Sequence, residues 1–387
     1  MVHARRNQVR ERPVQWPVLP EGGPGPSEYP ELVELCRQAE PVVSCYLNTE
    51  AETEDAWRRT GIRWKDASRD LEGAGADAAT LAAVGQAVED LRRLGPSVCV
   101  LGAGGRALLA EVGPWPLPRD LVHVGPLPVL GPLLGWRQHQ VAYITVACDH
   151  AGADVAVVGP RASFAASVGD QDRHDPELHK VPGGGWSHRR FQQRVENAWD
   201  RNAREVLDLV DRLATRLQPR LVLYGGEPRA CGLVEEHAAP ALRPYLQRAA
   251  LSRAADGSWG HDLLSVRRAV ERAVEADTAA VIARLGDARP RGLGVSGAAD
   301  VLGALGAARV EVLVVDDGAA GMRRAYLCRG PLGAALERDE LASLDGPLVE
   351  DHLADVAVAA ALLGGASVRV APGAGLPDGL GALLRFA

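Results

Sequence analysis

Residues 182–199, PGGGWSHRRFQQRVENAW, combine a run of glycines with a cluster of basic side chains. The glycines lack the Cβ atom that restricts other residues, so their backbone can adopt conformations closed to other residues. Arginine suits phosphate, because its guanidinium group is always charged and carries several hydrogen-bond donors. This chemistry predicts an RNA-binding segment. The expected RNA-binding residues are His179, Lys180, Gly183, Gly184, Gly185, Trp186, Ser187, His188, Arg189, Arg190 and Arg194.

The glycines are expected to lead into a long amphipathic helix. Ser187 has the residue type of an N-cap, and apolar residues follow it at spacings of three, four or seven. The expected buried positions are Phe191, Val195, Trp199, Val206, Val210, Leu213 and Leu217. The arginines of the first turns, with Arg201 and Arg204, would then lie on the polar face.

Composition limits where RNA could bind. A chain of 387 residues is too long for one ordinary core and predicts two or three domains. The formal net charge of −7 is not that of a general nucleic-acid binder. Contacts with RNA must therefore come from local basic patches.

The run Gly184-Gly185-Trp186-Ser187-His188-Arg189-Arg190-Phe191 resembles the Gly-Gly-Gln-Ser-x-x-Arg-Phe segment of archaeal and eukaryotic class I release factors. In that family the glutamine positions a water molecule against the peptidyl-tRNA ester. Trp186 takes its place here, and an indole has one N–H donor and no acceptor oxygen. The resemblance implies that the chain binds the same site on the ribosome but does not hydrolyse the peptidyl-tRNA ester. More specifically, the chain resembles the bacterial branch of this superfamily, which includes ribosome-hibernation factors.

The resemblance implies an α/β (α+β) protein with three domains. A flexible tail would cover residues 1–30, and an N-terminal α/β domain on the decoding-centre side would cover residues 31–138. A central RNase H-like release-factor domain with the glycine loop would cover residues 139–286. Residues 287–387 would form an L7Ae-like, Pelota-like α/β/α domain, because the run from Gly379 to Phe386 is similar to that family's end. The Asn-Ile-Lys-Ser loop that reads stop codons does not occur in this sequence.

Several elements can be placed from local patterns. Two strands are expected around the turn between Asp149 and Asp154, and another strand over residues 220–224. Helices are expected over residues 261–285, with Leu264, Val270, Val274 and Ile282 buried, and over residues 348–363. Residues 113–136 are expected to form strands and loops interrupted by prolines. The glycines from Gly102 to Gly105 favour a hairpin turn over a dinucleotide site, because β-like sequence follows them.

Other candidate sites are weaker. Six cysteines are scattered without a Cys-x-x-Cys pair, so no metal or disulfide role is expected for them. His174 and His179 lie near Asp172 and Asp175, but their spacing is irregular and Pro176 breaks a helix there, which favours a solvated loop. We expect no metal and no cofactor. We also expect a cytoplasmic protein without membrane contact, because no signal peptide or membrane-length apolar run is present.

The leading hypothesis is a non-hydrolytic factor that binds rRNA and occupies the A site of idle ribosomes under stress, with elongation factor Tu as a candidate partner. The alternative is a peptidyl-tRNA hydrolase that rescues stalled ribosomes. In that enzyme His188 would act as a general base, or Gln192 and Gln193 would position water. A third hypothesis is a tRNA-shaped module that acts away from the ribosome, because a fold does not fix a function.

Overall fold

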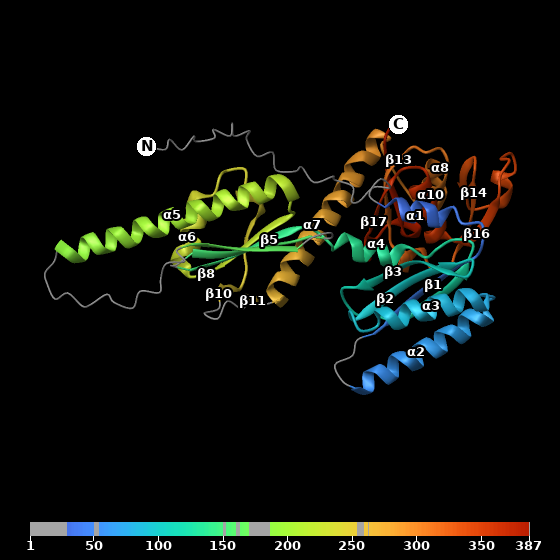
Figure 1. The fold of residues 1–387 in the computed structure, drawn as a ribbon. Helices are drawn as coiled ribbons and strands as arrows, with labels where there is room; N and C mark the ends of the chain where they lie inside the picture. Colours follow the sequence, from blue (N-terminus) through green and yellow to red (C-terminus); the bar gives the residue numbers. More distant parts are fainter. Residues whose placement is uncertain are drawn as a thin grey trace, which may run out of the picture. The chain divides into compact units, whose positions relative to one another are not determined.

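The computed structural model describes residues 29–49, 54–149, 152–159, 163–169, 186–253, 259–261 and 263–386 (Figure 1). These residues form helices and several sheets, which confirms the predicted mixed α/β class. The chain divides into two compact units. The described part of unit 1 lies within residues 139–275, and that of unit 2 within residues 29–138 and 276–386.

Unit 1 is built on a mixed five-stranded sheet with the strand order β7-β6-β5-β8-β9. Strands β5, β6 and β7 are successive antiparallel neighbours, whereas β8 runs parallel to both β5 and β9. A short antiparallel pair, β10 and β11, lies outside this sheet. The strands are β5 (Tyr143–Asp149), β6 (Gly152–Val158), β7 (Ser163–Gly169), β8 (Leu221–Gly226), β9 (Leu246–Arg248), β10 (Leu251–Arg253) and β11 (Trp259–His261).

Helices cover the two faces of this sheet. Because successive strand side chains point to opposite faces, Val222 and Tyr224 pack with helices α5 and α6, whereas Leu221 and Leu223 pack with α7. The long helix α5 lies between β7 and β8 in the chain. The helices are α5 (Trp186–Leu217), α6 (Pro228–His237) and α7 (Leu263–Ala288), with a 3₁₀ turn at Arg243–Tyr245.

The first part of unit 2 is an antiparallel sheet with the strand order β3-β2-β1-β4. Val43, Cys45 and Leu47 alternate along β1 and pack under helices α2 and α3. The strands are β1 (Val42–Asn48), β2 (Ser97–Ala103), β3 (Arg106–Gly113) and β4 (Leu121–Gly125). The helices are α1 (Pro30–Cys36), α2 (Glu54–Gly73), α3 (Ala78–Leu91) and α4 (Gly131–Gln138).

The last part of unit 2 has two further sheets, with the orders β12-β18-β13-β17 and β15-β14-β16. Strands β13 and β17 are parallel, and the other pairs are antiparallel. The strands are β12 (Gly294–Ser296), β13 (Val310–Val315), β14 (Arg324–Arg329), β15 (Leu332–Ala335), β16 (Leu348–His352), β17 (Ser367–Val370) and β18 (Leu380–Leu384). The helices are α8 (Ala298–Gly306), α9 (Asp317–Ala320) and α10 (Leu353–Leu363), with 3₁₀ turns at Arg289–Arg291, Arg338–Leu341 and Pro377–Gly379.

One apolar core joins these two parts of unit 2. It contains Tyr46 and Leu101 from the first sheet together with Leu302 and Leu313 from the last part of the chain. Helix α10 is apolar on nearly all sides and is buried in this core. The Gln138 side chain adds a polar connection, because it donates to the backbone oxygen of Val370 at 3.0 Å and accepts from its N–H at 2.6 Å.

The hairpin prediction is confirmed, since β2 and β3 are joined through Gly104 and Gly105 at φ angles of 57° and 73°. Three other predictions are wrong. Residues 348–352 form strand β16, which pairs with β14, so the last long helix begins only at Leu353. Helix α4 occupies residues expected to be strand and loop, and the side chain of Leu264 in α7 is 53% exposed. Among the described residues, no helix is both long and apolar enough to cross a membrane.

Candidate functional site

The predicted RNA-binding segment lies at the start of helix α5. The helix begins at Trp186, so Ser187 is its second residue and not its N-cap. The side chains of Trp186, Ser187, His188, Arg189, Arg190, Gln192, Gln193 and Arg194 lie outside the described residues, although their backbone is helical. The loop before them is also outside the described residues, including His174, His179, Lys180, Gly183, Gly184 and Gly185.

Helix α5 is much longer than the strands on which it packs. It has 32 residues, which at about 1.5 Å per residue makes it about 48 Å long. Strands β5 and β6 have 7 residues each and are about 23 Å long. The first half of the helix therefore continues past the edge of the sheet, as the green helix in Figure 1 shows. This geometry carries the start of α5 away from the body of unit 1.

The second half of α5 anchors the helix to the sheet. Its buried residues recur with helical spacing and pack against β5, β6 and α6. They are Ala203, Val206, Leu207, Val210 and Ala214. The prediction of a buried face is confirmed for Val206 and Val210, whereas Leu217 at the end of the helix is 37% exposed. Asp200 forms an ion pair with Arg204 at 3.0 Å and a hydrogen bond with a ring nitrogen of His237 of α6 at 2.5 Å, which adds a polar connection.

Charge is distributed unevenly along α5. From residue 200 to its end, the four basic residues Arg201, Arg204, Arg212 and Arg216 match the four acidic residues Asp200, Glu205, Asp208 and Asp211. From residue 186 to 199, by contrast, the sequence has three arginines and a single acid, Glu196. The anchored half of α5 therefore has no net charge, and the net positive charge of the helix lies in the half that projects.

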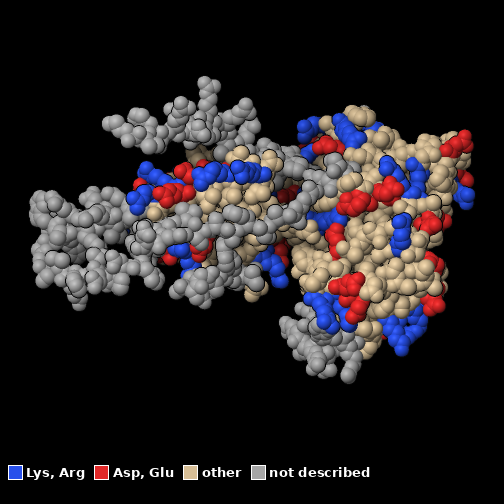
Figure 2. All heavy atoms as spheres, viewed as in Figure 1, with Lys and Arg blue, Asp and Glu red and all other residues tan. Residues whose placement is uncertain are grey.

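The described surface has no comparable concentration of charge in view. On the face drawn in Figure 2, basic and acidic side chains are interspersed over the described residues. This mixture agrees with the acidic composition of the chain and with the expectation that any RNA contact is local.

Half-buried polar contacts hold the junction between the end of β5 and the start of β6. Arg253 of β10 bonds Asp149 at the end of β5 at 2.8 Å and Asp154 of β6 at 3.2 Å. Burial opposes the charge of Arg253, but the hydrogen bonds to these two carboxylates outweigh it and raise its pKa. Sequence reasoning missed Arg253, because nothing local links it to the strands of the sheet.

Two further contacts fix the junction between β8 and α6. The Tyr224 hydroxyl donates to Glu235 at 2.6 Å, and burial together with this carboxylate raises the pKa of Tyr224 to about 12. The thiols of Cys148 and Cys231 are 3.6 Å apart, and this contact, together with burial, raises the pKa of Cys148 well above its usual value. The Tyr224 hydroxyl and the Cys148 thiol therefore stay protonated at neutral pH.

Glu227 and Arg229 follow strand β8: Glu227 directly precedes α6, and Arg229 is the second residue of that helix. Glu227 is the N-cap residue of α6, and its backbone N–H donates to the carbonyl oxygen of Cys148 at 2.9 Å. Gly226 has a φ of 123°, and its Cα approaches the same carbonyl so closely that a Cβ there would lie 1.9 Å from the oxygen. These contacts are structural: they hold the carboxyl ends of β5 and β8 together under α5.

Comparisons with known proteins include a family model that matches this region. Residues 142–291 match the sequence model of Bacterial archaeo-eukaryotic release factor family 2. The chain is 29% identical over 377 residues to the uncharacterized protein Rv2629 of Mycobacterium tuberculosis, covering 90% of this chain and 94% of that protein. Among solved structures, the archaeal translation termination factor aRF1 is 14% identical with a TM-score of 0.22, and 94% of each chain is covered. Archaeoglobus fulgidus Pelota is 12% identical with a TM-score of 0.38, covering 95% of this chain and 94% of that one.

Proposed function

We propose that this bacterial archaeo-eukaryotic release factor-like protein occupies the A site of idle ribosomes and leaves peptidyl-tRNA intact. The observation that carries the proposal is Trp186, the first residue of α5, which stands where the release-factor motif has its glutamine. The indole has one N–H donor and no acceptor oxygen, so it does not orient an attacking water as a carboxamide does.

In this proposal the projecting half of α5 enters the peptidyl-transferase centre. The Trp186 indole stacks on an exposed base, an interaction worth about 1 to 3 kcal/mol. Arg189, Arg190 and Arg194 neutralise nearby rRNA phosphates. The balanced half of the helix stays on the sheet and sets the direction of approach. Occupation of this site keeps an idle ribosome closed to other ligands during stress.

The rescue-enzyme alternative would need another residue to position water. Gln192 and Gln193 are six and seven residues after Trp186 in a continuous helix, which places them about 9 and about 10.5 Å along its axis. That distance removes them from the glycine loop that would reach the ester. His188 is only two residues into the helix and is the stronger candidate for a general base.

Co-sedimentation of the untagged protein with vacant bacterial ribosomes over a salt series tests the proposal. Each lost phosphate contact should make the slope of log K against log salt less steep by about 0.7 to 0.9. Arg189→Ala/Arg190→Ala should therefore weaken both the affinity and the salt dependence. Arg212→Ala/Arg216→Ala removes the same charge from the anchored half of the same helix and serves as the matched control. Equal effects of the two double variants, or no binding at low salt, would contradict the proposal.

A peptidyl-tRNA hydrolysis assay on the same complex separates a silent occupant from an enzyme. The wild-type protein should release no more peptide than ribosomes alone. Trp186→Gln restores the Gly-Gly-Gln sequence and should give measurable release if the loop reaches the ester. Release by the wild type that disappears in His188→Ala would instead establish the rescue enzyme.

Delivery by a translational GTPase is a further part of the proposal. Elongation factor Tu is the candidate, because it already brings ligands to the A site. Ribosome binding should become faster when elongation factor Tu and GTP are present. A binding rate that is unaffected by them would contradict the proposal that elongation factor Tu is a partner.

A further inference from the structure

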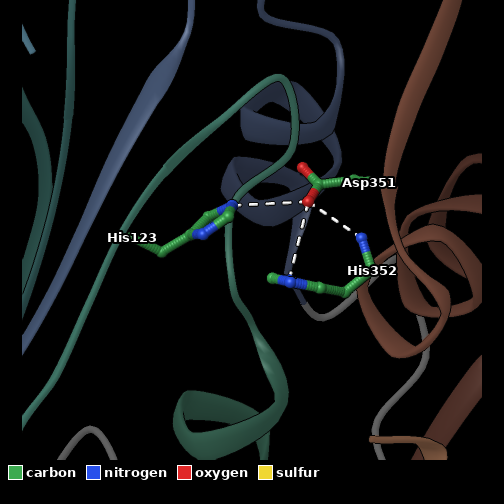
Figure 3. A group of neighbouring side chains, drawn as sticks. All are labelled: His123, Asp351 and His352. Carbon is green, nitrogen blue, oxygen red and sulfur yellow. Dashed lines mark hydrogen bonds and ion pairs between the residues drawn. The ribbon is translucent and has the colours of Figure 1, made fainter. Parts of the chain in front are cut away.

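Unit 2 contains a cluster of two histidines and one aspartate that the ribosome-binding proposal does not use. His123 comes from strand β4, and Asp351 and His352 end strand β16 (Figure 3). The side chain of Asp351 is 1% exposed, whereas those of His123 and His352 are 18% and 20% exposed. The cluster therefore lies at the edge of the core, with its carboxylate inside and its imidazoles toward the surface.

The ring nitrogens converge on one carboxylate oxygen. His123 Nε2 lies 3.3 Å from Asp351 Oδ1, and His352 Nδ1 lies 3.7 Å from the same oxygen. All three potential ligand atoms are within 4.8 Å of one another. In a tetrahedral zinc site, bond lengths of about 2.0 to 2.1 Å place neighbouring ligand atoms about 3.3 Å apart. The spacing of this cluster is thus close to that of a zinc coordination shell.

The carboxylate is oriented by the backbone. Asp351 Oδ1 accepts the N–H of His352 at 2.9 Å, and Oδ2 accepts the N–H of Leu127 at 3.2 Å. Backbone contacts of this kind fix a ligating carboxylate in known metal sites. His123 Nε2 is buried and has no hydrogen-bond partner of good geometry among the described residues, although it faces the carboxylate. The lone pair of this imidazole nitrogen can therefore coordinate an ion at the centre of the cluster.

Two neighbouring groups complete the surroundings. Asp355 Oδ2, in the first turn of α10, lies 3.5 Å from His352 Nδ1 and supplies a further carboxylate. Arg324 Nη1 lies 3.7 Å from Asp351 Oδ1 and opposes a cation, but this side chain is 46% exposed and also bonds Glu350 at 3.1 Å. An exposed guanidinium can turn to Glu350 without leaving a buried charge unpaired.

We propose that His123, Asp351 and His352 bind one zinc-class divalent cation, with the carboxylate of Asp355 beside His352 as an outer contact. Two imidazoles and a carboxylate favour zinc over magnesium or calcium, which prefer shells made entirely of oxygen. The ion joins β4 of the first sheet to β16 and α10 of the last part of the chain. It would therefore stabilise unit 2 where the first and last parts of the chain meet.

The test is a zinc titration of the untagged, metal-stripped full-length protein, measured by isothermal titration calorimetry. We expect one equivalent of zinc to bind. His123→Gln and Asp351→Asn should each lower the affinity more than about 100-fold, since loss of a second-shell contact alone typically costs about 10- to 100-fold. His237→Gln, which changes a histidine paired with Asp200 in unit 1, is the matched control and should keep wild-type affinity.

Cobalt substitution identifies the ligands independently of the variants. Cobalt should give the visible absorption of a four-coordinate nitrogen and oxygen site, without the near-ultraviolet band of a thiolate ligand. Zinc should also raise the melting temperature of the wild type and of His237→Gln but not of His123→Gln. If His123→Gln does not fold, the stoichiometry of zinc binding to the wild type and the cobalt spectrum still test the proposed site. No stoichiometric binding, a thiolate spectrum, or binding lost only in His174→Gln/His179→Gln would overturn the proposal.

Discussion

Replacement of Gly226 by alanine should destabilise unit 1, whereas the same replacement six residues later should not. At Gly226 the φ of 123° is strained for any residue with a side chain, and this costs about 1 to 3 kcal/mol. The new Cβ would also lie 1.9 Å from the carbonyl oxygen of Cys148. Strand β8 must then move away from β5, which breaks the 2.9 Å hydrogen bond from Glu227 to that oxygen. A lost hydrogen bond adds about 1 kcal/mol, so we expect a total loss of about 2 to 4 kcal/mol.

Gly232 is the matched control, because it lies in helix α6 and a Cβ there would meet nothing within 4 Å. Alanine is a better helix former than glycine, so Gly232→Ala should stabilise the protein by about 0.5 to 1 kcal/mol. Urea unfolding followed by circular dichroism gives both free energies of unfolding. Hydrogen exchange of peptides from β8 and α6 locates the change. A Gly226→Ala variant as stable as the wild type would refute the account of this junction.

Three further predictions concern burial and charge. Arg137→Met should lower the free energy of unfolding by about 1 to 3 kcal/mol, because the guanidinium is 6% exposed and pairs with Glu31 and Glu111; unchanged urea unfolding would contradict this. Val210→Ala should cost about 1 to 3 kcal/mol through the cavity left under α5, where Val210 is 1% exposed, and a smaller loss would mean that the helix repacks. Burial and two neighbouring carboxylates raise the pKa of Asp317 from 3.8 to about 7, so the folded state binds this proton more tightly than the unfolded chain. Stability should therefore fall as pH rises from about 4 to about 7, and Asp317→Asn should remove up to about 4 kcal/mol of that fall. Parallel pH profiles of the two proteins would show that Asp317 is not responsible.

Local sequence patterns correctly predicted the helices and turns whose formation depends on residues close together in the chain. The helical spacing of Val206 and Val210 predicted the buried face of α5, and the glycines after β2 predicted the hairpin into β3. Strand β16 was missed because its state depends on pairing with β14, which is distant in the sequence. Its residues pass directly into α10, so the apolar helix pattern concealed the strand before it.

The same distinction applies to the candidate sites: one is continuous in the sequence, and the other is assembled by the fold. The basic segment at the start of α5 is continuous in the sequence, so its residue types alone indicated RNA. The cluster of His123, Asp351 and His352 joins residues that are far apart in the chain, and no spacing rule predicts it. Only the packing of the first and last parts of unit 2 around a common core brings these residues together.

Chemical probing of rRNA on vacant ribosomes tests the central claim most directly. The wild-type protein should protect bases in the A site of the peptidyl-transferase centre, and Trp186→Ala should lose that protection while the Arg212→Ala/Arg216→Ala control keeps it. Protection elsewhere on the ribosome, or protection of the peptidyl-transferase centre that is the same without Trp186, would contradict the account.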